Sequence, residues 1–158
     1  MKKFKNVSIA VLTLLICLTV GFIWGNSLPS KAQSSKTSSG VYAAVKPVLD
    51  VVFGVDKVTH GTFRKMAHFS EFFLLGAEVS LLYLLIFGFD WKKCYLVFLF
   101  GLVVAAIDET IQIFTGRGAA VLDVIIDYLG YLTACASFIL IGVIRSVIIK
   151  NRNNKEKS

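Results

Sequence analysis

The feature that most constrains this chain is a series of four apolar runs, each long enough to cross a lipid bilayer as a helix. They cover about residues 7–24, 66–89, 94–114 and 121–149. A membrane-spanning helix needs about 20 mainly apolar residues, whereas the strands of a membrane barrel alternate apolar and polar side chains. These runs are continuous, so we predict an all-α membrane protein built as a four-helix transmembrane bundle.

The composition agrees with this class and excludes others. Hydrophobic residues make up 56% of the 158 residues and charged residues 17%, against about 45–50% and 25% in soluble domains. Four spans of about 20 residues use about half of the chain. We therefore predict one transmembrane domain over residues 1–158, with no separate soluble catalytic domain.

The positive charge has a simple explanation in a membrane protein. The formal net charge is +7, and the Lys and Arg residues lie mainly at the ends of the apolar runs. Basic residues in such positions orient the protein and contact anionic lipid. We expect membrane lipids as partners and no nucleic acid, and the sequence leaves homo-oligomerisation open.

The basic residues also predict an orientation. With the N-terminus inside, ten basic residues lie on the cytoplasmic side and seven on the outer side, which together make the 17 Lys and Arg. Cytoplasmic loops carry the excess of Lys and Arg, so we predict that both termini are cytoplasmic. Residues 150–158 then form a basic cytoplasmic tail, and residues 26–62 form an outer loop.

The first run has a second interpretation as a cleaved signal peptide. Ser30 and Ala32 occupy the −3 and −1 positions of a candidate cleavage site. The apolar part is longer than the about 7–15 residues usual for such a peptide, which favours an uncleaved span. Gly21 and Gly25 lie four residues apart in this run, a spacing that allows close helix contact.

The outer loop divides into two parts. Residues 30–40 are rich in Ser and Lys, and we expect them to be flexible. Residues 41–58 are apolar but interrupted by charged residues, Gly54 and Pro47, too often for a span. We predict that this second part forms a short interfacial helix or covers the bundle from outside.

The last three runs contain polar and ionisable residues, which cost about 2.5–3.5 kcal/mol each at a helix centre on insertion scales. These residues are His68, Glu71 and Glu78, then Asp108, Glu109 and Gln112, then Asp123 and Asp127, with Arg117 in the turn 115–120. At about 1.5 Å per helical residue, all except Glu78 fall in the outer half of the membrane. Singly they have plain structural explanations, such as a helix cap at Asp123 or head-group anchoring by Arg117.

Helical spacing places these residues on one face of each helix. The faces consist of Arg64, His68, Glu71 and Glu78; of Gly101, Ala105, Asp108 and Gln112; and of Asp123, Asp127 and Tyr131. Small residues, including Gly130, share faces where a neighbouring helix can approach closely. We therefore predict that the three helices form one polar cluster with a function.

Four separated motifs resemble those of the VanZ-like membrane proteins. They are RKMAHFSEF at 64–72, DETIQIF at 108–114, Gly116-Arg117, and DVIIDYLG at 123–130. The matched signature positions are Lys65, His68, Glu71, Asp108, Glu109, Gln112, Arg117, Asp123 and Asp127. The chain departs from the pattern at Thr115, where many members have proline, and at Phe72, where tyrosine is common.

The resemblance implies a role at the outer face of a bacterial cytoplasmic membrane and lowered susceptibility to lipid-tailed glycopeptide antibiotics such as teicoplanin. It implies no settled activity, cofactor or metal. In this interpretation Lys65, Gln112 and Arg117 bind a phosphate or ligand, and Arg64, Asp123, Asp127 and Tyr131 support them. The expected ligand is a lipid-linked cell-wall precursor or the lipoglycopeptide itself.

Two alternatives stay open. The first is a membrane-embedded enzyme acting on a lipid or lipid-linked precursor, with His68, Glu71, Asp108 and Glu109 as an acid/base or metal site. No spacing matches an established metal or nucleophile motif. The second is a proton or ion pathway that extends inward through Glu78.

Overall fold

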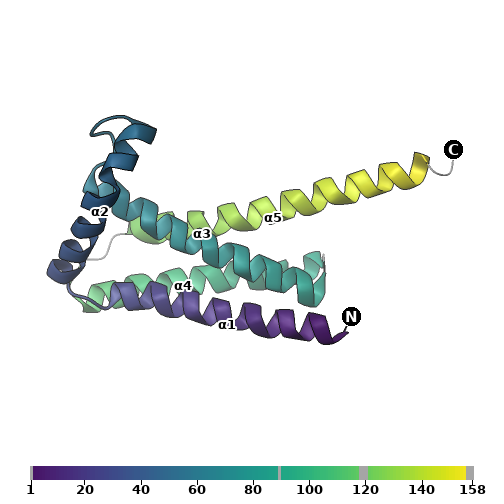
Figure 1. The fold of residues 1–158 in the computed structure, drawn as a ribbon. Coiled ribbons are helices and arrows are strands. Elements are labelled where there is room, and N and C mark those ends of the chain that lie inside the picture. Colours follow the sequence, from purple (N-terminus) through teal and green to yellow (C-terminus); the bar gives the residue numbers. More distant parts are fainter. Residues whose placement is uncertain (1, 89, 118–120, 156–158) are drawn as a thin grey trace.

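The structure is a computed structural model, which describes residues 2–88, 90–117 and 121–155. Its elements are α1 (Lys2–Ser27), α2 (Lys31–Phe53), α3 (His60–Phe87), the short 3-10 helix η1 (Trp91–Lys93), α4 (Cys94–Phe114) and α5 (Val121–Lys155). Four of the helices form a bundle, and α2 crosses one end of it (Figure 1). The all-α prediction is confirmed for this part of the chain.

In the described part of the chain, four helices are long and apolar enough to cross a membrane. They are Lys3–Ser27, His60–Phe87, Cys94–Phe114 and Val121–Gly142. The predicted number of spans is therefore confirmed, and the chain is a multi-pass membrane protein. The second predicted run extended to position 89, which lies outside the described residues.

The ends of the spans have local causes. Helix α3 ends before Gly88, whose φ of 65° is left-handed and suits glycine. Helix α5 continues beyond its apolar part to Lys155, so most of the predicted tail 150–158 is helical. Residues 156–158 of that tail lie outside the described part of the chain. In Figure 1 both chain ends lie toward the side of the bundle opposite α2.

The expected flexibility of residues 30–40 is wrong, because α2 is one helix from Lys31 onward. Ser30 and Gln33 form a capping box, in which each side chain bonds the other residue's backbone N–H. Tertiary contacts hold the rest: Ser38 Oγ lies 2.8 Å from His60 Nε2, and the Tyr42 hydroxyl donates to the Val58 carbonyl at 2.6 Å.

The C-terminal end of α2 combines an ion-pair cluster with exposed apolar side chains. Lys46 Nζ lies 2.6 Å from Asp50 Oδ2 and 2.8 Å from Asp56 Oδ1, which ties the helix to the following loop. The exposed apolar side chains are Val48, Val51, Val52, Phe53 and Val55. The predicted interfacial position of this segment stays a prediction, and the helix that carries it is longer than expected.

Two glycines determine how closely α5 packs against its neighbours. A Cβ atom on Gly130 would lie 2.3 Å from the Phe69 carbonyl oxygen of α3, and one on Gly101 of α4 would lie 2.4 Å from the Tyr131 ring. The predicted close approach at these two positions is confirmed. It brings α3, α4 and α5 together beside the polar residues.

The same spacing argument fails for the first span. A Cβ atom on Gly21 or Gly25 would meet no atom within 4 Å. Among the described residues this pair does not make the close contact that its spacing allows, because α1 packs against α3 and α4 through another face. That face includes Ile16 and Ile23, which are buried.

Candidate functional site

The polar residues gather around a cavity of about 210 Å³, at the end of the bundle that α2 crosses. The N-terminal turns of α3 and α5, the C-terminal turn of α4 and the start of α2 all contribute. The lining residues are Lys31, Gly61, Arg64, Lys65, His68, Gln112, Arg117, Asp123, Ile126 and Asp127. The structure thus brings together seven of the residues that the sequence singled out, from motifs up to 63 positions apart.

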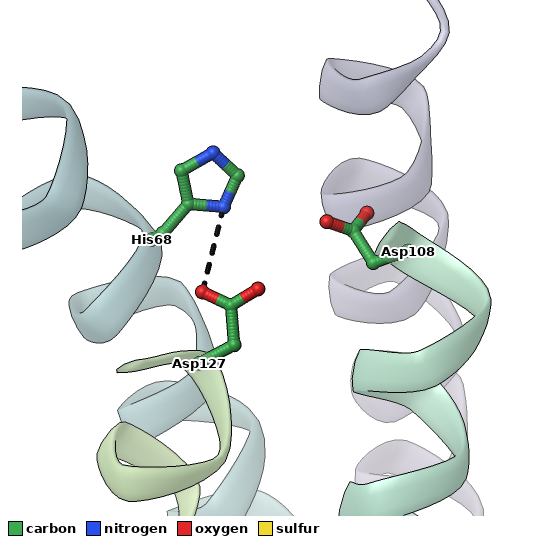
Figure 2. A group of neighbouring side chains, drawn as sticks. All are labelled: His68, Asp108 and Asp127. Atoms are coloured by element: carbon green, nitrogen blue, oxygen red, sulfur yellow. Dashed lines mark ion pairs between the residues drawn. The ribbon is translucent and has the colours of Figure 1, made fainter. Parts of the chain in front are cut away.

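Two of the lining side chains, His68 and Asp127, lie close to a third, Asp108, which is buried and does not line the cavity. His68 of α3 and Asp127 of α5 face each other, with 3.7 Å between His68 Nδ1 and Asp127 Oδ1. Asp108 of α4 points toward the same space from the opposite side (Figure 2). One nitrogen or oxygen atom from each residue lies within 4.8 Å of the other two. Asp108 and Asp127 are buried, with 0% and 1% of their surface exposed.

Helix α1 holds part of this cluster in place. Gln112 Nε2 donates to Asp108 Oδ2 at 2.8 Å and to Ser27 Oγ at 3.3 Å. The Thr115 hydroxyl donates to the Ser27 carbonyl at 3.2 Å. The end of α1 therefore fixes both the amide that orients Asp108 and the turn that follows α4.

Four basic side chains lie at the cavity. Lys31 and Lys65 are exposed, whereas Arg64 and Arg117 are half-buried. One terminal nitrogen of Arg117 donates to the Asn26 carbonyl at 2.9 Å, and its Nε has no hydrogen-bond partner. Burial and, to a smaller extent, the nearby Arg64 lower the pKa of the Arg117 guanidinium. Its carboxylate neighbours act in the opposite direction; they are Asp108, Glu109 and Asp123.

A second cavity, of about 320 Å³, adjoins the first and shares Arg64, His68 and Arg117 with it. Glu71 lines this second cavity, where its Oε1 accepts a hydrogen bond from Asn26 Nδ2 at 3.1 Å. Glu71 shares this cavity with His68 but does not belong to the group formed by His68, Asp108 and Asp127. The two cavities together place acidic and basic groups in one open region.

Three other predicted residues have different surroundings. Glu109 is buried on α4 and acts electrostatically on Arg117. The Tyr131 hydroxyl donates to the Val97 carbonyl at 2.7 Å, and Tyr131 lines neither of these two cavities. Glu78 accepts a hydrogen bond from the Thr19 hydroxyl at 3.1 Å, apart from the cluster.

Sequence reasoning missed the contribution of α1 and of the loop after it. Asn26 and Ser27 bond to site residues, and Lys31 lines the first cavity. The available signal was a polar pair directly after the apolar part of the first run. In the sequence that pair resembles the beginning of a loop. Nothing local identifies its hydrogen-bond partners, which lie 45 or more residues away.

Comparison with known proteins agrees with the resemblance of the motifs. The family model described as VanZ/LLP1 matches residues 9–142, which include most of the first span, the other three spans and both cavities. No curated protein and no solved structure matches the chain. Since the family match covers well over half of the sequence, this multi-pass membrane protein belongs to the VanZ/LLP1 family.

Proposed function

We propose that this protein binds the phosphate-bearing head group of a lipid-linked cell-wall precursor at the outer face of a bacterial cytoplasmic membrane. Through this binding it lowers susceptibility to lipid-tailed glycopeptides such as teicoplanin. The observation that carries the proposal is the cavity of about 210 Å³ with four basic side chains, at one end of a bundle of apolar helices. Arg and Lys are the side chains that bind phosphate oxygens.

The arrangement suits a ligand with a charged head and an apolar tail. Lys31 and Lys65 are exposed at the cavity, where they can meet a phosphate without first losing another partner. Arg117 also lines the cavity, and its buried Nε has no hydrogen-bond partner. The apolar surfaces of the spanning helices lie directly below, where a lipid tail packs without leaving the bilayer.

The link to glycopeptides follows from where such a drug acts. A lipid tail anchors the drug in the same outer leaflet as its target, the lipid-linked precursor. A membrane protein that holds the precursor head group therefore competes most with the anchored drug. A glycopeptide without a tail, such as vancomycin, approaches from solution and is affected less.

Drug susceptibility tests this proposal. We expect deletion of the gene to lower the inhibitory concentration of teicoplanin and to leave that of vancomycin nearly unchanged. The wild-type gene should restore resistance, whereas a gene carrying Lys65→Gln and Arg117→Gln should not. Immunoblots of the membrane fraction control for expression. Equal teicoplanin sensitivity of the deletion and parent strains would contradict the proposal.

An enzyme acting on a lipid or lipid-linked precursor is a second candidate. The observation in its favour is the buried polar atoms without hydrogen-bond partners, among them His68 Nδ1 and Glu71 Oε2. Such groups, together with Asp108 and Glu109, supply candidates for proton transfer to a bound substrate. Lipid profiles of strains carrying His68→Ala or Glu109→Gln test this candidate. Accumulation of one lipid class supports it, and unchanged profiles rule it out.

A further inference from the structure

His68 and Asp127, which line the first cavity, form an arrangement of potential ligands together with the buried Asp108. Three helices each contribute one side chain: His68 from α3, Asp108 from α4 and Asp127 from α5 (Figure 2). One nitrogen or oxygen atom of each lies within 4.8 Å of the other two. His68 Nδ1 and Asp127 Oδ1 are separated by 3.7 Å, which is too long for a direct hydrogen bond.

A second observation concerns the carboxylate oxygens of Asp108 and Asp127 that have no hydrogen-bond partner. Asp108 Oδ1 and Asp127 Oδ2 are buried and have no hydrogen-bond partner, in side chains whose residues are 0% and 1% exposed. Gln112 bonds only the other oxygen of Asp108. A buried carboxylate left in this state is costly, and buried charges are usually paired or bound to metal ions.

The basic residues nearby do not supply the missing partner. Among the described residues, neither Asp108 nor Asp127 forms an ion pair with Lys or Arg within 4.0 Å. Arg117, in the turn after α4, donates to the backbone carbonyl of Asn26. Two carboxylates and one imidazole thus lie together without an ion pair to Lys or Arg among the described residues.

We propose that His68 Nδ1, Asp108 and Asp127 bind one divalent transition-metal ion of the Zn²⁺ or Mn²⁺ type. Ligand atoms about 2.0–2.2 Å from such an ion lie about 3–4 Å from one another, and the 3.7 Å between His68 and Asp127 is within this range. An imidazole in the ligand set favours Zn²⁺ over Mg²⁺ or Ca²⁺, and the two carboxylates also suit Mn²⁺. Small side-chain shifts bring Asp108 to the same distance.

The surroundings support the assignment. The amide of Gln112 fixes the orientation of the Asp108 carboxylate, as hydrogen bonds to the ligand side chains do at metal sites. Three protein ligands leave at least one coordination position open toward the cavity. This part of the inference rests on the proposed function: a phosphate oxygen takes the open position, while Lys65 and Arg117 contact the other oxygens.

Metal content of the full chain in detergent provides the first test. After removal of metal by a chelator, the protein is dialysed against Zn²⁺ or Mn²⁺ and its bound metal is measured. We expect one ion per chain. Asp108→Asn, Asp127→Asn and His68→Ala should each lower the affinity at least about tenfold. Glu78→Gln is the matched control, because Glu78 is a buried carboxylate outside this group, and it should bind metal as the wild type does.

A spectrum of the wild-type protein keeps the inference testable even where a variant fails to fold. Pulsed electron paramagnetic resonance of bound Mn²⁺ should show coupling to an imidazole nitrogen. Absence of a bound ion in the wild type, absence of nitrogen coupling, or unchanged affinity in all three variants would overturn the inference.

The metal site and the proposed function can be contradicted independently of each other. Stoichiometric metal in a protein whose deletion leaves teicoplanin susceptibility unchanged supports the metal site and contradicts the proposed function. A susceptibility change on deletion of a protein that binds no metal supports the proposed function and contradicts the metal site.

Discussion

At the scale of single residues, Gln112 connects the polar cluster to the packing of the bundle. Its amide donates both to Asp108 and to Ser27, so one side chain on α4 links the candidate site with α1. The amide is buried with both partners. A buried acceptor that loses its donor costs about 1–3 kcal/mol, which gives Gln112 a structural role in addition to the predicted ligand contact.

This role predicts a loss of stability on Gln112→Leu. The change leaves Asp108 Oδ2 without its donor, so we expect the free energy of unfolding to fall by about 1–3 kcal/mol. Thermal unfolding of the detergent-solubilised protein measures the effect. Thr110→Val is the control, since Thr110 is exposed on the same helix and should change stability by less than about 0.5 kcal/mol. A similar melting temperature for both variants would argue against the coupling.

A second residue-scale prediction concerns Gly130. The methyl group of Gly130→Ala would lie 2.3 Å from the Phe69 carbonyl oxygen, so α3 and α5 must separate. We expect a loss of about 1–3 kcal/mol, the usual cost of overpacking, seen as a lower melting temperature. Gly25→Ala meets nothing within 4 Å and should keep or raise stability. Equal behaviour of the two variants would mean that the helices do not pack this closely.

At the scale of the element, α2 differs most from its expected form. Its first half is polar and its second half is apolar, and none of its described side chains is buried. Contacts to His60, Phe63 and Val58 hold it across the end of the bundle. The apolar side chains near its C-terminal end, Val48, Val51, Val52 and Phe53, are exposed, and a membrane surface is the environment that suits them.

This arrangement predicts that Val51, which is 86% exposed, lies in the lipid. A nitroxide label at Val51→Cys, with the native cysteines replaced by serine, should collide more with dissolved oxygen than with a water-soluble nickel chelate. A label at Ser35→Cys, in the polar half, should show the reverse. Equal accessibility to the chelate at both positions would place the whole helix in water.

At the scale of the whole molecule, the arrangement of the helices puts the polar cluster at one end of the bundle and both chain ends toward the other. The cluster lies where α2 crosses the bundle, and the termini lie toward the other end (Figure 1). If the basic residues orient the bundle as predicted, the cavities open outward. The orientation thus decides which leaflet the candidate site serves.

Labelling of intact cells tests this orientation. In a variant whose native cysteines are replaced, Ser35→Cys should react with a membrane-impermeant maleimide added from outside. Lys92→Cys, in the turn at the opposite end of the spans, should react only after permeabilisation. The reverse pattern would place the cluster on the cytoplasmic side and would exclude a role at the outer surface.

The sequence by itself determined the four spans and most members of the polar cluster. Both signals are local, because they depend on the length of apolar runs and on helical spacing along one segment. Residues such as His68 and Asp108 stand out because a charge in an apolar run is rare and costly. Their presence on one face of each helix was therefore predictable without knowledge of the neighbours.

Only the tertiary structure decided which of these residues meet. It grouped Asp127 with His68 and Asp108, placed Glu71 beside Asn26, and brought α1 into the site through Ser27. It also ordered residues 31–53 as a helix and left Gly21 and Gly25 without the contact that their spacing allows. Spacing along a helix defines a face, but the partner of that face depends on the packing of segments 45 or more residues apart.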